Sequence, residues 1–170
     1  MHHVSAHAPC IALRQCGAPG IYNRPVNEIL RKAGERGHAM KLPYAGALLP
    51  AEAHALMQEG AKLVDVRTEA ELQYVGSVPG SEAIEWNTFP EGKRNPDFLK
   101  QLESAVGKDT PVMFLCRSGV RSHHAAVAAT QAGWKTAYNV LEGFEGDKDA
   151  DGHRGNLGGW RKAGLPWVQG

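Results

Sequence analysis

Short apolar runs alternate with amphipathic stretches between residues 42 and 141 of this chain. Apolar runs bounded by Gly, Pro, Asn or Asp predict strands, and apolar residues that recur every three or four positions predict helices. The predicted strands span residues 42–49, 62–67, 81–86, 111–115 and 136–141. The predicted helices span residues 25–36, 50–58, a segment that follows Thr68, 95–106 and 122–132. This alternation indicates an α/β fold.

The pattern also predicts how the sheet is built. Residues 111–115 form a continuous apolar run, which is typical of a strand buried on both faces of a parallel sheet. We therefore expect a central, mainly parallel five-stranded sheet with helices on both faces. Thr68 and Glu71 match a capping box, Asn95 is placed to cap the helix at 95–106, and Gly37 to end the first helix. Ligands bind such sheets at the carboxyl ends of the strands.

Composition and charge narrow the function classes. The chain has 170 residues, of which 42% are hydrophobic and 22% charged, as expected for one soluble globular domain. A net charge of +1 gives no overall attraction for nucleic acid or an anionic membrane, and no apolar run is long enough to span a bilayer. Three cysteines exclude a disulfide scaffold and leave at least one free thiol. Because the N-terminus also lacks the features of a secretory signal, we expect a cytoplasmic protein.

The segment Leu-Cys-Arg-Ser-Gly-Val-Arg-Ser at residues 115–122 carries the clearest chemical signal. It joins a buried strand to the start of a helix, where backbone N–H groups form a concave anion site. Gly119 allows a tight turn, and Arg117 and Arg121 add positive charge suited to oxyanions. A cysteine that faces such a loop is favoured as the reactive thiolate. Cys116 is therefore the predicted nucleophile.

Five stretches of the chain, in order, resemble a single-domain rhodanese, which is a thiosulfate sulfurtransferase-like protein. They are residues 63–72, 76–81, 116–121, 138–143 and the Gly-Trp and Gly-Leu-Pro pair at 159–166. Ser77 departs from the pattern, since the family usually has His there. The resemblance divides the chain into an N-terminal extension at residues 1–42, partly disordered with one helix at about 25–36, and a rhodanese-like domain at residues 43–170.

The resemblance implies a function for the loop. In the family, the cysteine takes the outer sulfur of a donor such as thiosulfate, becomes a persulfide, and passes the sulfur to cyanide or a thiol. Carried over, Cys116 is the sulfur carrier, and the substrate-binding residues are those of the following loop: Arg117, Ser118, Gly119, Val120, Arg121 and Ser122. Arg117 is expected to face the pocket mouth. No cofactor is implied, and a protein acceptor of sulfur is a further possible partner.

Two other functions remain open. The loop from Cys116 to Arg121 has six residues, whereas the related dual-specificity phosphatases use seven, so the cradle is sized for sulfur rather than phosphate. This disfavours a phosphatase or arsenate reductase. The second alternative is a low-turnover sulfur-relay or protein-binding module, which the intact cysteine and loop arginines disfavour.

Asp65 lies inside an apolar strand, and a buried carboxylate needs a partner. Arg121 or Arg67 could supply it, because all three lie at the same sheet edge. We interpret Asp65 and Arg67 as structural support, with Asp65 orienting the loop arginine, rather than as a general base and its partner.

Several further groups have weaker signals. Asp147, Asp149 and Asp151 resemble the start of a calcium loop, but the twelfth position is Gly158 and not Glu, so we expect a polar loop and no metal. Cys10 and Cys16 match no common zinc spacing. The side chains that could line the pocket or simply pack beside it are Trp86, Phe89, His123 and His124.

Overall fold

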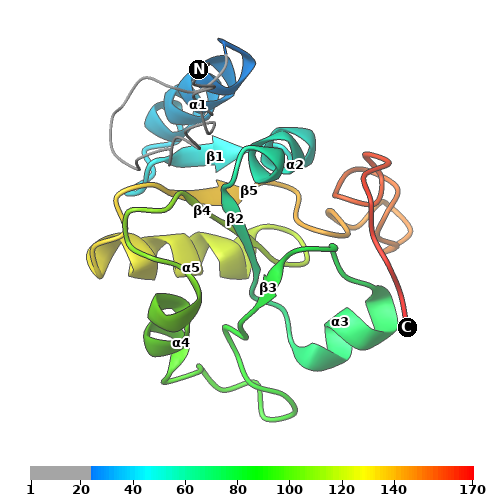
Figure 1. Cartoon of the computed structure of the whole chain (residues 1–170). Helices are drawn as coiled ribbons and strands as arrows, with labels where there is room; N and C mark the ends of the chain where they lie inside the picture. The colour runs from blue at the N-terminus through cyan, green and yellow to red at the C-terminus, as the bar shows by residue number, and fades with distance from the viewer. Residues whose placement is uncertain (1–23) are drawn as a thin grey trace, which may run out of the picture.

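The central sheet has five strands, all parallel, in the order β1-β5-β4-β2-β3. A computed structural model of the chain describes residues 24–170 (Figure 1). The strands are β1 (Gly46–Leu48), β2 (Lys62–Asp65), β3 (Glu82–Ala83), β4 (Val112–Leu115) and β5 (Ala137–Val140). The predicted parallel five-stranded sheet is confirmed, although each strand is shorter than its apolar run because the run continues into the loop.

Helices cover both faces of this sheet. They are α1 (Arg24–Ala39), α2 (Pro50–Gln58), α3 (Glu69–Val75), α4 (Phe98–Ala105) and α5 (Val120–Gln131). Figure 1 shows α1 and α2 on one side of the sheet and α4 and α5 on the other, with α3 beyond β3. The α/β class with helices on both faces is therefore confirmed.

The sheet separates two hydrophobic cores, and alternate residues of its strands point into each. Along β4, Val112 and Phe114 pack with α4 and α5, whereas Met113 and Leu115 pack with α1 and α2. This division follows from the two-residue period of a strand. Cys116 continues the alternation and belongs to the core on the α5 side. The period of the strand thus directs the cysteine toward the start of α5.

Helix α1 packs into the core on the α1 and α2 side of the sheet, although the helix lies in the range predicted as an N-terminal extension. Its Val26 and Ala33 are buried there, and Arg36 forms an ion pair with Glu52 of α2 at 2.9 Å. Gly37 does not end α1 as predicted. A side chain at that position would lie 2.8 Å from the Gly46 Cα atom, so the glycine instead allows the helix to approach β1.

Helices α4 and α5 also begin at residues other than those predicted. Helix α4 begins at Phe98 and not at Asn95, because the Asn95 side chain is used elsewhere. Its Oδ1 accepts from the Asp97 N–H at 3.0 Å, and its Nδ2 donates to the Glu85 carbonyl at 2.8 Å. Helix α5 begins two residues earlier than predicted, at Val120, directly after the loop glycine.

The C-terminal segment packs back onto the domain. The Trp160 side chain is buried, and its Nε1 donates to the Pro166 carbonyl at 2.9 Å. Val168 forms an antiparallel bridge with Ser77, with backbone hydrogen bonds of 2.8 and 2.9 Å. The contribution of Ser77 to this bridge is therefore made by its backbone and not by its side chain. No helix within residues 24–170 is long and apolar enough to cross a membrane.

Candidate active site

Cys116 lies at the carboxyl edge of the sheet, directly after β4. Asp65, the last residue of β2, is paired in register with Leu115, and the Val66 N–H donates to the Leu115 carbonyl at 2.8 Å. The parallel register thus brings the segment after β2 and the segment after β4 to one edge. The predicted meeting of the Asp65 and Cys116 segments is what the structure shows.

The loop after Cys116 turns so that two donors face its sulfur. The Gly119 N–H donates to Sγ at 3.1 Å, and the Ser122 hydroxyl is 3.2 Å from it. Gly119 has φ of 103°, which lies in the left-handed region that favours glycine. Cys116 itself is only 1% exposed. Two donors at a buried sulfur, together with the N-terminus of α5, stabilise negative charge on that atom.

The turn after β5 backs this loop and was not predicted as part of the site. The Phe144 N–H donates to the Cys116 carbonyl at 2.8 Å, and the Glu145 N–H donates to the Arg117 carbonyl at 2.9 Å. Gly143 has φ of 64°, and a side chain there would lie 2.5 Å from the Cys116 carbonyl oxygen. The turn therefore fixes the first two peptide units of the loop.

Asn139 holds the other end of the same loop. It is almost fully buried in β5, and its Nδ2 donates to the Gly119 carbonyl at 3.2 Å. The Gly119 peptide is thus held on both sides, by Cys116 Sγ through its own N–H and by Asn139 through its carbonyl. The only sequence signal for this role is that residues 138–143 belong to the stretches that carry the family resemblance.

Arg121 does not pair with Asp65. Its guanidinium makes a two-pronged contact with Glu71, with Nη1 2.8 Å from Oε2 and Nη2 2.7 Å from Oε1. Glu71 also accepts from the Thr68 N–H at 2.9 Å and thereby completes the capping box of α3. The expected Asp65–Arg121 pair is wrong because the capping carboxylate has oxygen atoms free to bind the guanidinium.

Both charges of the Glu71–Arg121 pair are perturbed. Burial raises the pKa of Glu71, but hydrogen bonds from Arg121 and Thr68 outweigh burial and lower that pKa to about 2. The hydrogen bond to Glu71 raises the pKa of Arg121, and the nearby Cys116 adds to that rise. The pair is therefore ionised throughout the neutral range and ties α3 to the first turn of α5.

Asp65 pairs with Arg67, the other candidate partner, and both side chains are fully buried. The guanidinium contacts the carboxylate through Nε at 2.9 Å and Nη2 at 2.7 Å. Nη2 also donates to the Gly76 carbonyl at 2.8 Å, and the group stacks over the Phe144 ring. Burial raises the pKa of Asp65, and Arg67 opposes the rise. The structural role predicted for both residues fits this burial, away from solvent.

A cavity of about 530 Å³ opens beside the loop. Its walls come from α3, the segment at residues 87–92 and the two loop arginines, and they are lined by Thr68, Ala70, Glu71, Val75, Asn87, Thr88, Phe89, Pro90, Gly92, Arg117 and Arg121. Cys116 is not part of the wall because its side chain is covered. Arg117 is exposed and borders the cavity, as expected for a residue at the pocket mouth.

The remaining candidate residues divide between the loop surface and the core. Val120 is exposed, and Ser118 is partly exposed. His123 packs against Tyr44, whose hydroxyl lies 2.7 Å from Nδ1. Trp86 contacts the Phe98 ring and not the cavity. Of the two aromatic wall candidates, only Phe89 lines the cavity.

The aspartate-rich loop is held by its own hydrogen bonds. The Asp149 carboxylate accepts from the Asp151 and His153 N–H groups and from Asn156 Nδ2. Within residues 24–170 no group of three or more His, Cys, Asp or Glu side chains could hold a metal ion. Cys10 and Cys16 lie outside the described residues.

Glu71→Gln should make stability less dependent on pH under acidic conditions. A carboxyl whose pKa is lowered on folding, here from 4.5 to about 2, contributes stability that is present above pH 4.5 and lost as pH falls toward 2. The glutamine variant lacks this contribution and should lose about 1.5–3 kcal/mol at pH 7, where the charged hydrogen bonds are removed.

The measurement is urea denaturation of both proteins at several pH values between 2.5 and 7. Glu69→Gln is the control, because Glu69 lies in the same first helical turn but is exposed. If the difference between parent and Glu71→Gln stayed constant across this range, the Glu71 assignment would be wrong.

Comparisons with known proteins agree with this geometry. A family model described as a rhodanese-like domain matches residues 49–150. The chain resembles the crystal structure of Rv0390 from M. tuberculosis, with 47% identity and a TM-score of 0.69, over 75% of this chain and 99% of that one.

Two sequence relatives align with this chain over most of their own length. The uncharacterized protein RP600 of Rickettsia prowazekii is 35% identical over 114 residues, which is 66% of this chain and 86% of RP600. The protein named thiosulfate sulfurtransferase 16, chloroplastic, from Arabidopsis thaliana is 32% identical over 115 residues, 67% of this chain and 85% of that protein.

Proposed function

Because the chain belongs to the rhodanese-like domain family, we propose that it is a sulfurtransferase that carries a sulfane sulfur on Cys116. The observation that supports this most is the sulfur of Cys116 at the base of a six-residue loop, with the Gly119 N–H and the Ser122 hydroxyl directed at it. The name of the Arabidopsis relative, thiosulfate sulfurtransferase, points to the same chemistry.

In the first half-reaction, the Cys116 thiolate attacks the outer sulfur of an anionic donor such as thiosulfate. A new S–S bond forms to Sγ, the S–S bond of the donor breaks, and its electron pair leaves with sulfite. The product is a Cys116 persulfide with the negative charge on its terminal sulfur. Donors in the loop and the N-terminus of α5 stabilise this charge. Arg117, exposed at the cavity, attracts the incoming anion.

In the second half-reaction, a thiophilic acceptor attacks the terminal sulfur. Cyanide gives thiocyanate, and a thiol gives a new persulfide; in both cases the electron pair of the breaking S–S bond returns to Cys116. No change in the oxidation state of the protein remains after the cycle. A small acceptor or the thiol of a partner protein fits this step, and the proposal places the reaction in the cytoplasm, as expected from the sequence.

The test is steady-state formation of thiocyanate from thiosulfate and cyanide, measured beside hydrolysis of p-nitrophenyl phosphate. The parent should form thiocyanate and leave the phosphate ester intact, and Cys116→Ser should form none above the uncatalysed rate, because the hydroxyl is a weak nucleophile. Phosphate release at a rate above that of thiocyanate formation would favour the phosphatase alternative. Thiocyanate formation by the serine variant at the parent's rate would remove Cys116 from the reaction.

A further inference from the structure

The Gly119 peptide, whose N–H faces the Cys116 sulfur, is held from behind by the Asn139 side chain. The Gly119 carbonyl accepts from Asn139 Nδ2 at 3.2 Å and from the His123 N–H at 3.3 Å. The other end of the amide, Oδ1 of Asn139, is buried and has no hydrogen-bond partner within residues 24–170. An unpaired buried acceptor costs free energy. The amide therefore keeps this orientation because its N–H groups are needed where they lie.

The second N–H of this amide serves Tyr44. Tyr44 lies between α1 and β1 and is only 7% exposed. Burial raises the pKa of Tyr44 to about 12, and a hydrogen bond with the Asn139 side chain opposes that rise. A hydrogen bond has this effect when it is donated to the ionisable oxygen, and the donor of an asparagine side chain is its amide nitrogen. The two N–H bonds of Asn139 thus serve two oxygens, those of Gly119 and Tyr44.

The hydroxyl proton of Tyr44 is then directed at His123. The Tyr44 oxygen lies 2.7 Å from Nδ1 of His123, and the two rings meet edge to face. Because the amide already donates to the Tyr44 oxygen, Nδ1 is the acceptor, as in a neutral imidazole. Burial, and then the charge of His124, lower the pKa of His123 and favour this neutral form. The titratable side chains that face the His123 ring within residues 24–170 are Tyr44, from the segment before β1, and His124, from α5 itself.

We propose that Tyr44 and His123 are positioning residues for the reactive sulfur: neutral His123 orients the Tyr44 hydroxyl, which orients the Asn139 amide and so fixes the Gly119 peptide. We call these four residues the positioning network. Neither Tyr44 nor His123 touches the sulfur, and both act through the Gly119 N–H, which is 3.1 Å from it. The proposal rests on the proposed sulfur-transfer function and adds residues outside the loop to its site. Protonation of His123 turns Nδ1 into a donor and thereby breaks the network.

The first experiment measures the rate at which excess thiosulfate loads sulfur on Cys116 between pH 5 and 8, followed by intact mass. His123→Ala removes the acceptor and should slow loading about two- to tenfold, the worth of one hydrogen bond. His123→Asn keeps an acceptor oxygen near the position of Nδ1 that takes up no proton. It should retain most of the parent's rate at pH 8 and lose less of it than the parent does toward pH 5. His124→Asn is the matched control and should follow the parent, because His124 is the exposed neighbour in the same helix.

Two outcomes of this experiment would overturn the role of His123. One is a pH profile of His123→Asn that matches the profile of the parent. The other is a loss of rate in His123→Ala that the asparagine variant does not recover at pH 8, since an acceptor is then not what the site needs.

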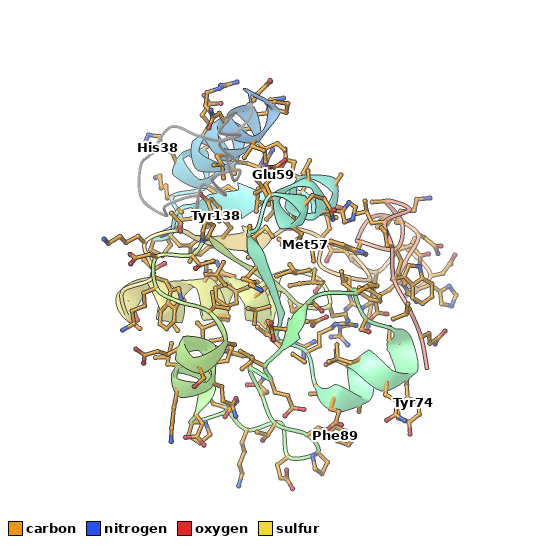
Figure 2. All side chains as sticks on the ribbon, viewed as in Figure 1. His38, Met57, Glu59, Tyr74, Phe89 and Tyr138 are labelled. Atoms are coloured by element: carbon orange, nitrogen blue, oxygen red, sulfur yellow. The ribbon has the colours of Figure 1, made fainter. Side chains whose placement is uncertain are left out.

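Tyr44→Phe deletes the middle of the network with little change in shape and should also slow loading about two- to tenfold. Tyr74→Phe is the control and should leave the rate unchanged, because Tyr74 is 72% exposed. Figure 2 shows Tyr74 at the edge of the molecule on α3, well away from Tyr138 on β5. In an Asn139→Ala background, Tyr44→Phe should have little further effect, since two changes within one network are not additive. Additive losses would show that Tyr44 does not act through Asn139 and would overturn the proposal.

A second experiment tests the network without sulfur transfer, by NMR of the Cys116→Ser protein. The side-chain amide signals of Asn139 should shift with pH at the same midpoint as the His123 ring signals, and most of this shift should disappear in Tyr44→Phe. If the shift behaves in this way but no donor loads sulfur on the parent, the proposed function fails and the positioning network stands. If sulfur loads but the Asn139 signals do not follow His123, or follow it equally without the Tyr44 hydroxyl, the positioning network fails alone.

Discussion

Asp65→Ala should lower the free energy of unfolding by about 3–5 kcal/mol, as expected when one member of a buried ion pair is removed. The loss is large because Arg67 is fully buried, and a guanidinium cannot avoid the cost of burial by giving up its proton. In the variant, the partners that its guanidinium retains within residues 24–170 are the Gly76 carbonyl and the Phe144 ring. Urea denaturation at pH 7 measures the difference.

Two further variants make the Asp65 prediction specific. Arg67→Met should lose less than Asp65→Ala, because a buried carboxyl left alone can take up a proton whereas a buried guanidinium cannot lose one. The double variant, which combines Asp65→Ala with Arg67→Met, should be more stable than Asp65→Ala alone. Glu35→Ala serves as control, since it breaks the exposed Arg31–Glu35 pair and should cost less than about 1 kcal/mol. A loss of that small size in Asp65→Ala would contradict the buried pair.

Gly143→Ala should reduce both stability and turnover. At φ of 64°, an alanine is strained by about 1–2 kcal/mol. Its Cβ would also lie 2.5 Å from the Cys116 carbonyl oxygen and the Arg117 carbonyl carbon. Because both contacts are backbone, the active-site loop itself must shift. A displacement of this kind should reduce kcat/KM for sulfur transfer about 10- to 100-fold.

Gly152→Ala is the matched control for Gly143→Ala. Gly152 has φ of 82°, and a side chain there would meet no atom within 4 Å. This variant carries the same backbone strain without the contact to the loop, so it should lose stability but keep its turnover. If both variants lost turnover equally, strain alone would explain the effect, and the close packing of the turn against the loop would have no part in it.

The sheet and the loop could be predicted because their signals are local. The apolar run of β4 and the Cys-Arg-Ser-Gly-Val-Arg segment after it lie within a few residues of each other. The five parallel strands follow from strands that alternate with helices. The two-residue period of a strand also indicates the correct partner of Asp65, since Asp65 and Arg67 are two positions apart and lie on one side of the chain.

The rest of the site depends on contacts between distant segments. Glu71 carries a capping-box signature, and nothing in that signature shows that its carboxylate also binds Arg121, 50 residues away. Asn139 reads as an ordinary strand residue, yet its amide holds the Gly119 carbonyl. Gly37 was predicted to end α1 because glycine often does so, but close packing against Gly46 requires it within the helix. Such roles become visible only when the segments are packed.

The measurement that tests sulfur carriage most directly is the mass of the intact protein after incubation with a donor and removal of the excess. The parent should gain about 32 Da, the mass of one sulfur on the nucleophilic thiol, and should lose it when cyanide is added. Peptide mapping should place that sulfur on Cys116, and Cys116→Ser should gain none. A sulfur found on Cys10 or Cys16, or retained by the serine variant, would contradict the assignment of Cys116 as the carrier.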